Sequence, residues 1–219
     1  IPARYNADSR RLFEASGCAG KLGVFAVRTD TYAVPDKEQV FYLGTNNAEK
    51  LTQLRKDILT NFENLPEMAE YLHRTIFKIT ESYGKDTFLS INYLGTKNIP
   101  KFFAVKAKVE NLLKRLPLLS DSLPDKILFY LSKLFPQHLP KRMLEFSDKY
   151  EHHLILKMSD KGIAEVQDYL KKHWSKEYDS GFFACRTDEG NKALLHRFAA
   201  GAAAGRYQMI HNNKVEGIL

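Results

Sequence analysis

A cluster of basic side chains is the feature of this sequence whose residue type and spacing most clearly suit binding, namely the binding of anions. Between positions 97 and 142, ten basic residues stand against three acidic ones, a net charge of +7, and the rest of the chain is neutral on balance. Such a concentration predicts an electropositive face that binds anionic lipid, nucleic acid or an acidic partner. The ten cations are Lys97, Lys101, Lys106, Lys108, Lys114, Arg115, Lys126, Lys133, Lys141 and Arg142.

A glycine-rich run near the start of the chain, residues 16–24, is the second candidate for a site. Gly17, Gly20 and Gly23 recur every three residues, which permits a phosphate or a flat ring to approach the backbone closely. The spacing is not that of a Rossmann fingerprint, and Leu22 stands where a P-loop needs Ser or Thr for magnesium. A plain turn is the competing interpretation.

Histidines and cysteines predict no metal site. His152 and His153 are adjacent, but neighbours on a strand point to opposite faces, so a structural pair is favoured over a shared metal ion or a general base. Cys18 and Cys185 lie far apart in the sequence, which argues against a disulfide framework or a zinc finger and favours a reducing compartment.

A contact with a membrane is expected only at its surface. No uncharged apolar stretch approaches the roughly 20 residues that span a bilayer, and no signal-peptide pattern opens the chain. Pro124 and Pro136 bracket a predicted helix whose lysines, Lys126 and Lys133, fall away from its apolar face. That face consists of Ile127, Leu128, Leu131, Leu134 and Phe135. Such a helix can lie in a membrane interface, with leucines in the acyl boundary and ammonium groups at phosphates.

Two strand and helix groups must position these residues. Alternation predicts antiparallel pairing of strands at 22–32 and 39–44, followed by a helix at 48–62 that Asn46 or Asn47 caps. A second group comprises a strand at 151–158, a helix at 161–174, a strand at 181–185 and a helix beginning near Thr187. The predicted fold class is therefore α+β, an antiparallel sheet with helices on one face. A mostly helical basic insertion, broken by prolines, interrupts it.

Several segments of the sequence resemble those of a known family. The run from Gly20 to Phe25 is similar to the stretch that closes the flavin domain in FAD-linked oxidases of the vanillyl-alcohol oxidase type. Nearly end to end, the chain resembles the quinone-dependent D-lactate dehydrogenases of bacterial inner membranes. The segments that carry this resemblance include residues 3–8, 16–22, 61–66, 83–88, 148–153 and 195–200.

The resemblance implies a domain organisation and site residues. Residues 1–28 would end the FAD-binding domain, 29–72, 150–187 and 212–219 would be three parts of a cap, and 73–149 would be a membrane-binding insertion. Residues 188–211 would be a helical segment of the cap or the membrane region. Gly20, Gly23 and Val24 would lie beside FAD, and Arg197 would bind the D-lactate carboxylate through two hydrogen bonds. An ordinary surface arginine on an alanine-rich helix is the competing interpretation of Arg197.

The implied activity is oxidation of D-lactate to pyruvate, with electrons passing through FAD to quinone at the cytoplasmic side of the inner membrane. Ile1 and the unfinished run after His211 predict a piece of a longer protein, whose catalytic residues are unknown and expected elsewhere, so this chain should lack turnover. A nucleic-acid-binding module or a protein-interaction domain remains the alternative. No recognised nucleic-acid motif accompanies the cations, so anionic phospholipid is the expected partner.

Overall fold

The computed structural model describes residues 20–26, 33–98, 100–101, 104–105, 107–108, 123–174 and 179–211. The chain divides into two compact units, Ile1–Val34 and Pro35–Leu219. In the first unit, the described stretch 20–26 forms a turn and an extended, exposed segment without strand pairing. Gly20 has a φ of 76°, a left-handed conformation that glycine adopts without strain, which agrees with a turn at this position.

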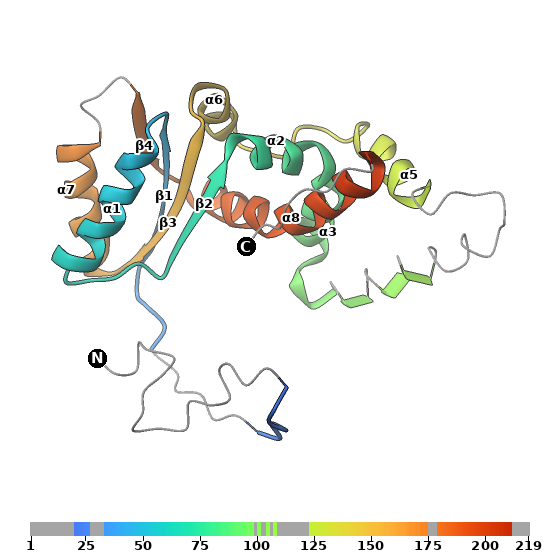
Figure 1. The fold of residues 1–219 in the computed structure, drawn as a ribbon, viewed down its shortest axis with the longest axis horizontal. Helices are drawn as coiled ribbons and strands as arrows, with labels where there is room; N and C mark the ends of the chain where they lie inside the picture. Colours follow the sequence, from blue (N-terminus) through green and yellow to red (C-terminus); the bar gives the residue numbers. More distant parts are fainter. Residues whose placement is uncertain are drawn as a thin grey trace. The chain divides into compact units, whose positions relative to one another are not determined.

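A four-stranded antiparallel sheet organises the second unit (Figure 1). Its strands are β1 (Glu38–Thr45), β2 (Met68–His73), β3 (His152–Ser159) and β4 (Ser180–Ala184), in the order β2-β3-β1-β4. β1 pairs with both β3 and β4, and β2 pairs with β3, all antiparallel. The predicted α+β class is thereby confirmed.

Two helices cover one face of this sheet (Figure 1). α1 (Ala48–Asn61) begins after Asn47, whose side chain accepts a hydrogen bond from the Glu49 amide at 3.0 Å, as the sequence predicts. α7 (Lys161–His173) lies beside it. Alternation along β1 and β3 directs one set of apolar side chains to these helices. That core comprises Phe41, Leu43, Leu54, Ile58, Leu156, Met158, Val166, Leu170 and Trp174.

The opposite face of the sheet is covered as well, which the sequence did not predict. It packs against α2 (Arg74–Tyr83), α3 (Lys85–Leu94), α6 (Lys141–Lys149) and α8 (Thr187–His211). Three of these helices belong to the predicted insertion, which also contains the short η3 (Thr96–Asn98), helical residues at 100–101, 104–105 and 107–108, and α5 (Leu123–Ser132). The prediction of short helices in place of one long helix is confirmed. The insertion shares a hydrophobic core with the sheet.

Small residues and one buried ion pair hold α8 to the insertion. A Cβ atom at Gly84, which joins α2 to α3, would lie 3.2 Å from the Cβ of Ala203 in α8. α8 therefore approaches this junction closely at a position where neither residue has a bulky side chain. Arg206 donates from Nη2 to Oδ2 of Asp86 at 2.8 Å, and both side chains are buried. The alanine-rich stretch of α8 therefore serves close helix packing.

The structure differs from the prediction at one strand and contains a further strand that was not predicted. Of the predicted strand at 22–32, the described residues 22–26 form no strand, and residues 27–32 lie outside the described part of the chain. β1 has hydrogen-bonded neighbours on both sides over Phe41–Thr45, so it has no free edge there for another strand. β2 was not predicted, because its six residues are too few to show a clear alternation. Pairing with β3 is what makes this segment a strand.

Candidate functional site

The C-terminal end of α5 presents two different sides. Phe129 stacks on Tyr83 of α2 with ring centroids 4.5 Å apart, and the buried Ser132 hydroxyl donates to the Phe129 carbonyl at 2.7 Å. The Phe129 ring therefore attaches the end of the helix to α2, whereas the Ser132 hydrogen bond lies within α5. The residues between and after them face solvent.

Apolar side chains dominate that solvent-facing side. Leu134 is 82% exposed, and Tyr130, Leu131 and Phe135 are each about half exposed or more. Three of these belong to the apolar face predicted for the helix, and they are not sealed in the core. The side chains of Ile127 and Leu128, the other members of that predicted face, lie outside the described part of the structure.

Most of the predicted membrane-binding cations that the structure describes are exposed. Lys126 is half-buried, and the exposed lysines are Lys97, Lys101, Lys108, Lys133 and Lys141. The ammonium of Lys133 lies 4.5 Å from the Phe129 ring centroid and 5.2 Å from that of Tyr130, which places a cation within the apolar patch. Lys141 forms a 3.6 Å ion pair with Glu145 one helical turn away. Lys106, Lys114 and Arg115 lie outside the described residues.

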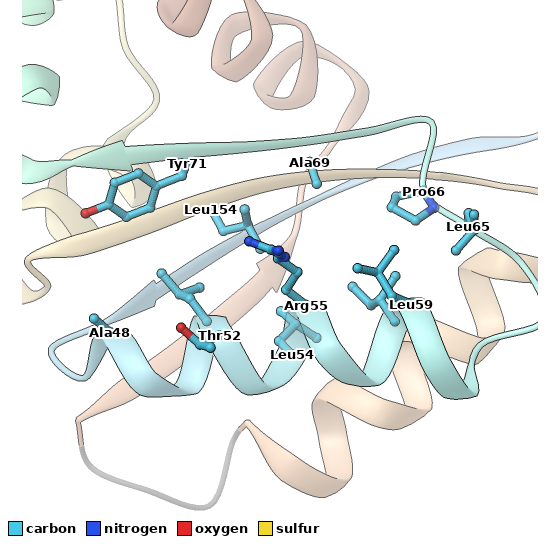
Figure 2. Close-up of a pocket in the computed structure, with 12 residues that line it drawn as sticks. Ala48, Thr52, Leu54, Arg55, Leu59, Leu65, Pro66, Ala69, Tyr71 and Leu154 are labelled. Carbon is cyan, nitrogen blue, oxygen red and sulfur yellow. The ribbon is translucent and has the colours of Figure 1, made fainter. Parts of the chain in front are cut away.

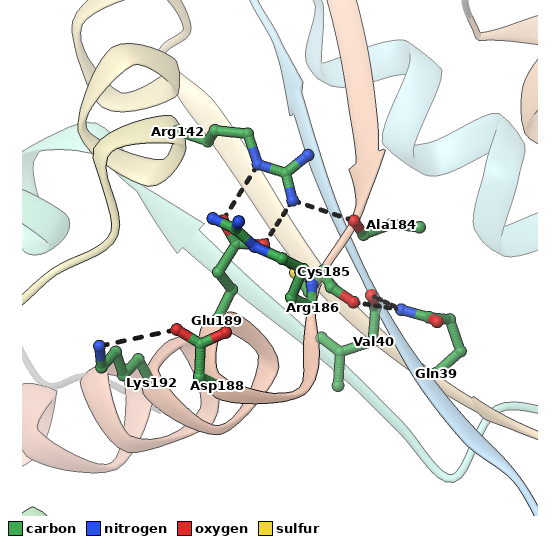
Figure 3. Close-up of polar contacts among 9 residues, drawn as sticks. All are labelled: Gln39, Val40, Arg142, Ala184, Cys185, Arg186, Asp188, Glu189 and Lys192. Atoms are coloured by element: carbon green, nitrogen blue, oxygen red, sulfur yellow. Dashed lines mark hydrogen bonds and ion pairs between the residues drawn. The ribbon is translucent and has the colours of Figure 1, made fainter.

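Arg142 differs from its neighbours because its charge is neutralised within the fold (Figure 3). Its guanidinium forms two hydrogen bonds with the buried carboxylate of Glu189, donates to the Ala184 carbonyl at 3.2 Å, and stacks over Phe183 at 4.2 Å. The Arg186 amide also donates to Glu189, at 2.8 Å. Arg142 therefore fastens α6 to the start of α8 and the end of β4.

This network sets the protonation state of two buried groups. Hydrogen bonding from Arg142 lowers the pKa of the Glu189 carboxyl to about 2, so the carboxylate is charged at neutral pH. Burial raises the pKa of the Cys185 thiol to about 12, and the nearby Glu189 carboxylate adds to the effect. Cys185 is consequently an inert thiol rather than a nucleophile.

The predicted flavin residues lie in the first unit, and the predicted substrate residue lies on α8 of the second unit. Gly20, Gly23 and Val24 belong to the exposed stretch of the first unit, where a Cβ atom at Gly20 would meet no atom within 4 Å. Arg197 lies on α8, where its guanidinium forms a 3.0 Å ion pair with Glu70 of β2.

Three buried histidines form a cluster that sequence reasoning missed. His138, His153 and His196 come from three separate segments. The Phe77 ring lies 4.4 Å from the His196 ring and 5.6 Å from the His153 ring between centroids, and the His138 ring lies 6.5 Å from that of His196. Their ring nitrogens make no hydrogen bond of ordinary geometry to any described residue. Burial lowers the pKa of His138 and His153 to about 4 and that of His196 to about 3, so all three are neutral at pH 7.

His152 and His153 point to opposite faces of β3, as alternation predicts. His153 is fully buried, whereas His152 shares a 2.8 Å hydrogen bond between its Nδ1 and the hydroxyl of Tyr71. Within the part of the chain that the structure describes, no three His, Cys, Asp or Glu side chains are grouped so that they could hold a metal ion.

A groove of about 560 Å³ lies between α1 and β2, on the face of the sheet away from the insertion (Figure 2). Leucines such as Leu51, Leu59 and Leu65 line it, and the guanidinium of Arg55 extends across it from α1. The lining contains no carboxylate, thiol or imidazole. The groove offers apolar contact area and one cation, but no acid–base pair for catalysis.

Comparison with known proteins identifies the family of the chain. A family model described as "D-lactate dehydrogenase, membrane binding" matches residues 40–219, most of the chain. The chain belongs to this family. The matched range includes nearly all of the sheet, the insertion and α8.

Three curated relatives carry the name quinone-dependent D-lactate dehydrogenase. The chain is 52% identical to the one from Escherichia coli (strain K12), 47% identical to the one from Haemophilus influenzae and 38% identical to the one from Corynebacterium glutamicum. Each match covers 100% of this chain but only 38% or 39% of the relative's length. Among the described residues, no helix combines the length and the apolar character needed to cross a membrane.

Proposed function

We propose that this chain is the membrane-docking part of an FAD-dependent, quinone-linked dehydrogenase that oxidises D-lactate to pyruvate at the cytoplasmic surface of the inner membrane. Family membership and three relatives named quinone-dependent D-lactate dehydrogenase support the proposal. Docking would bring the redox centre of the whole enzyme close to quinone, which dissolves in the bilayer. The expected partners are anionic phospholipid, quinone and D-lactate.

The observation that carries the docking role is the set of exposed lysines on the insertion. Lys97, Lys101, Lys108, Lys133 and Lys141 all extend into solvent, and only Lys141 has a carboxylate partner among the described residues. Near an anionic leaflet, each such cation contributes about 1 kcal/mol of attraction. Together they suffice for surface attachment without a spanning helix.

In this proposal the insertion, residues 73–149, binds lipid while the sheet acts as the cap of the active site. Residues 29–72 and 150–187, with 212–219, would form that cap, and residues 188–211 would join it to the membrane region. The helices α2, α3 and α6 share a core with β1 and β3, so the docking surface is built directly onto the sheet. Binding of the insertion to a membrane would thereby fix the orientation of the cap.

FAD would supply the redox chemistry of the whole enzyme. The stretch 20–26 fits a minor part in holding it, because the backbone at Gly20 and Gly23 is open to a flat ring. The same stretch supplies no carboxylate for a ribose, so most contacts with FAD would come from elsewhere. Arg197 would meet a lactate carboxylate only by releasing Glu70.

Co-sedimentation of the chain with lipid vesicles tests the proposal. We expect recovery with phosphatidylglycerol vesicles to exceed recovery with phosphatidylcholine vesicles in about 0.1 M salt, where screening acts over about 10 Å. The difference should shrink in about 1 M salt, where that length is about 3 Å. Equal recovery from both kinds of vesicle at low salt would contradict docking through the lysines.

A further inference from the structure

We propose that residues 130–135, here called the α5 turn, insert their apolar side chains into the acyl boundary of an anionic bilayer. Attachment would then combine burial of apolar surface with the attraction of charges. The inference rests on the proposed membrane docking and adds to it the element that penetrates. Leu134, the most exposed of the large side chains in the α5 turn, would lie deepest.

Several backbone groups of the α5 turn already have hydrogen-bond partners within the protein. The amides of Lys133, Leu134 and Phe135 donate to the carbonyls three residues earlier, at 3.2, 3.0 and 3.2 Å. The Phe135 carbonyl, at the end of the turn, accepts a hydrogen bond from the Lys85 ammonium at 2.6 Å. Because unpaired backbone groups are costly to bring into lipid, this satisfaction lowers the cost of insertion.

The α5 turn is attached to the insertion by packed rings. The Phe129 and Tyr83 rings are stacked with an interplanar angle of 12°, and the Tyr83 hydroxyl shares a 2.7 Å hydrogen bond with Nε2 of His211 at the end of α8. Tyr207 meets Tyr83 edge-on at 5.2 Å. The apolar side chains are therefore presented from a packed base, and little ordering is required when they bind.

The charge around the α5 turn identifies an anionic bilayer as the occupant. Lys133 emerges among Tyr130, Leu131 and Leu134, and a lysine stem can follow apolar surface while its ammonium reaches the lipid phosphates. The nearby carboxylate of Glu81 is engaged by Gln137 at 3.0 Å and by Lys78 at 3.6 Å. Leucines around a cation suit acyl chains beneath anionic headgroups.

Quenching by brominated lipid tests insertion directly. A Leu134→Trp variant of the full chain is mixed with phosphatidylglycerol vesicles whose acyl chains are brominated near their middle. The natural Trp174 is 2% exposed and lies in the core beneath α1 and α7, so it gives a constant background. Leu59→Trp is the matched control, because Leu59 is 63% exposed but lies on α1, across the sheet from the insertion.

We expect strong quenching and a blue shift for Leu134→Trp and neither for Leu59→Trp. A Leu134→Gln variant should also partition about tenfold more weakly, since burial of a leucine side chain is worth at least that factor, whereas Leu59→Gln should bind as the parent does. If both tryptophan variants bind vesicles but neither is quenched, insertion is wrong and docking by charge survives. If neither binds, the docking itself fails.

Discussion

Replacement of Arg142 by methionine separates a structural cation from the lipid-facing ones. Arg142 and Lys141 are adjacent on α6, yet Glu189 neutralises Arg142, while the Lys141 side chain is 90% exposed. In the Arg142→Met variant, the Glu189 carboxylate, which is 2% exposed, would keep only the Arg186 amide and side chain as partners. The variant should therefore lose stability without losing affinity for vesicles.

The size of the loss follows from the contacts that disappear. Two charge-assisted hydrogen bonds to a buried carboxylate are worth about 2 kcal/mol each when broken from one side. Arg142 is 40% exposed, so solvent screens part of this, and we expect a loss of about 2 to 3 kcal/mol in the free energy of unfolding. With a denaturant slope of about 2 kcal/mol per molar urea, the midpoint would fall by about 1 M.

Urea unfolding followed by circular dichroism measures the effect, with Lys141→Met as the matched control. A Glu189→Gln change in the Arg142→Met background should restore part of the loss, because it removes the uncompensated charge. The pKa of Glu189 is about 2 in the folded protein and near 4.5 otherwise, so its ionic contribution is complete above about pH 4.5 and is lost as the pH falls toward 2. The loss of unfolding free energy in Arg142→Met relative to Lys141→Met should thus be the same at pH 7 and at pH 5. Arg142→Met with parental stability and reduced affinity for vesicles would refute this reasoning.

Further predictions concern the core. Between about pH 6.5 and 4, the three buried histidines are protonated in the unfolded chain but stay neutral in the folded one. The free energy of unfolding should therefore fall as the pH drops, by about 1.4 kcal/mol per pH unit for each histidine. His196→Leu should flatten this dependence in urea titrations, and an unchanged slope would count against it. Asp86→Asn should cost about 3 kcal/mol because it removes the charge of a carboxylate that is buried in an ion pair with Arg206; thermal unfolding at the parental midpoint would contradict this. In a Cys18→Ser background, Cys185 should react with a thiol reagent at pH 8 only after denaturation, since its pKa is about 12; rapid labelling of the folded chain would exclude the buried position.

Local patterns in the sequence predicted the elements that depend on neighbouring residues. Short runs rich in strand-forming residues predicted β1 and β3, and the helical period of α1 predicted that helix, with Asn46 or Asn47 at its start. These signals lie within one short segment, so no knowledge of the rest of the fold is needed. The prolines of the insertion likewise predicted its short helices.

Features that depend on distant residues were not predictable in the same way. β2 is a strand because β3 lies beside it. The absence of a strand at residues 22–26 was not predictable, because the pattern of a segment does not show which strand of the sheet has a free edge for pairing. The second face of the sheet is covered because Phe77 and Met143 of the insertion pack onto it. Periodicity cannot show which apolar faces meet.

The candidate site shows the same division. Counting charges predicted the basic surface, and Lys133 and Lys141 are exposed as a docking role requires. Counting did not distinguish Arg142, because its partner Glu189 is distant in the sequence and close only in the fold. The participation of Lys85 at the α5 turn was likewise invisible without coordinates.

Docking to the membrane should depend on the position of the lysines rather than on their number, and a matched pair of charge-removal variants tests this. One variant converts Lys97, Lys101, Lys108 and Lys133 of the insertion to glutamine. The other converts four exposed lysines of α1 and α7, namely Lys56, Lys161, Lys171 and Lys172, so the net charge falls equally. Flotation with phosphatidylglycerol vesicles should show about a hundredfold loss of affinity for the first variant, from roughly four cations at up to 1 kcal/mol each, and a small loss for the second. Equal losses from both variants would contradict docking through the insertion.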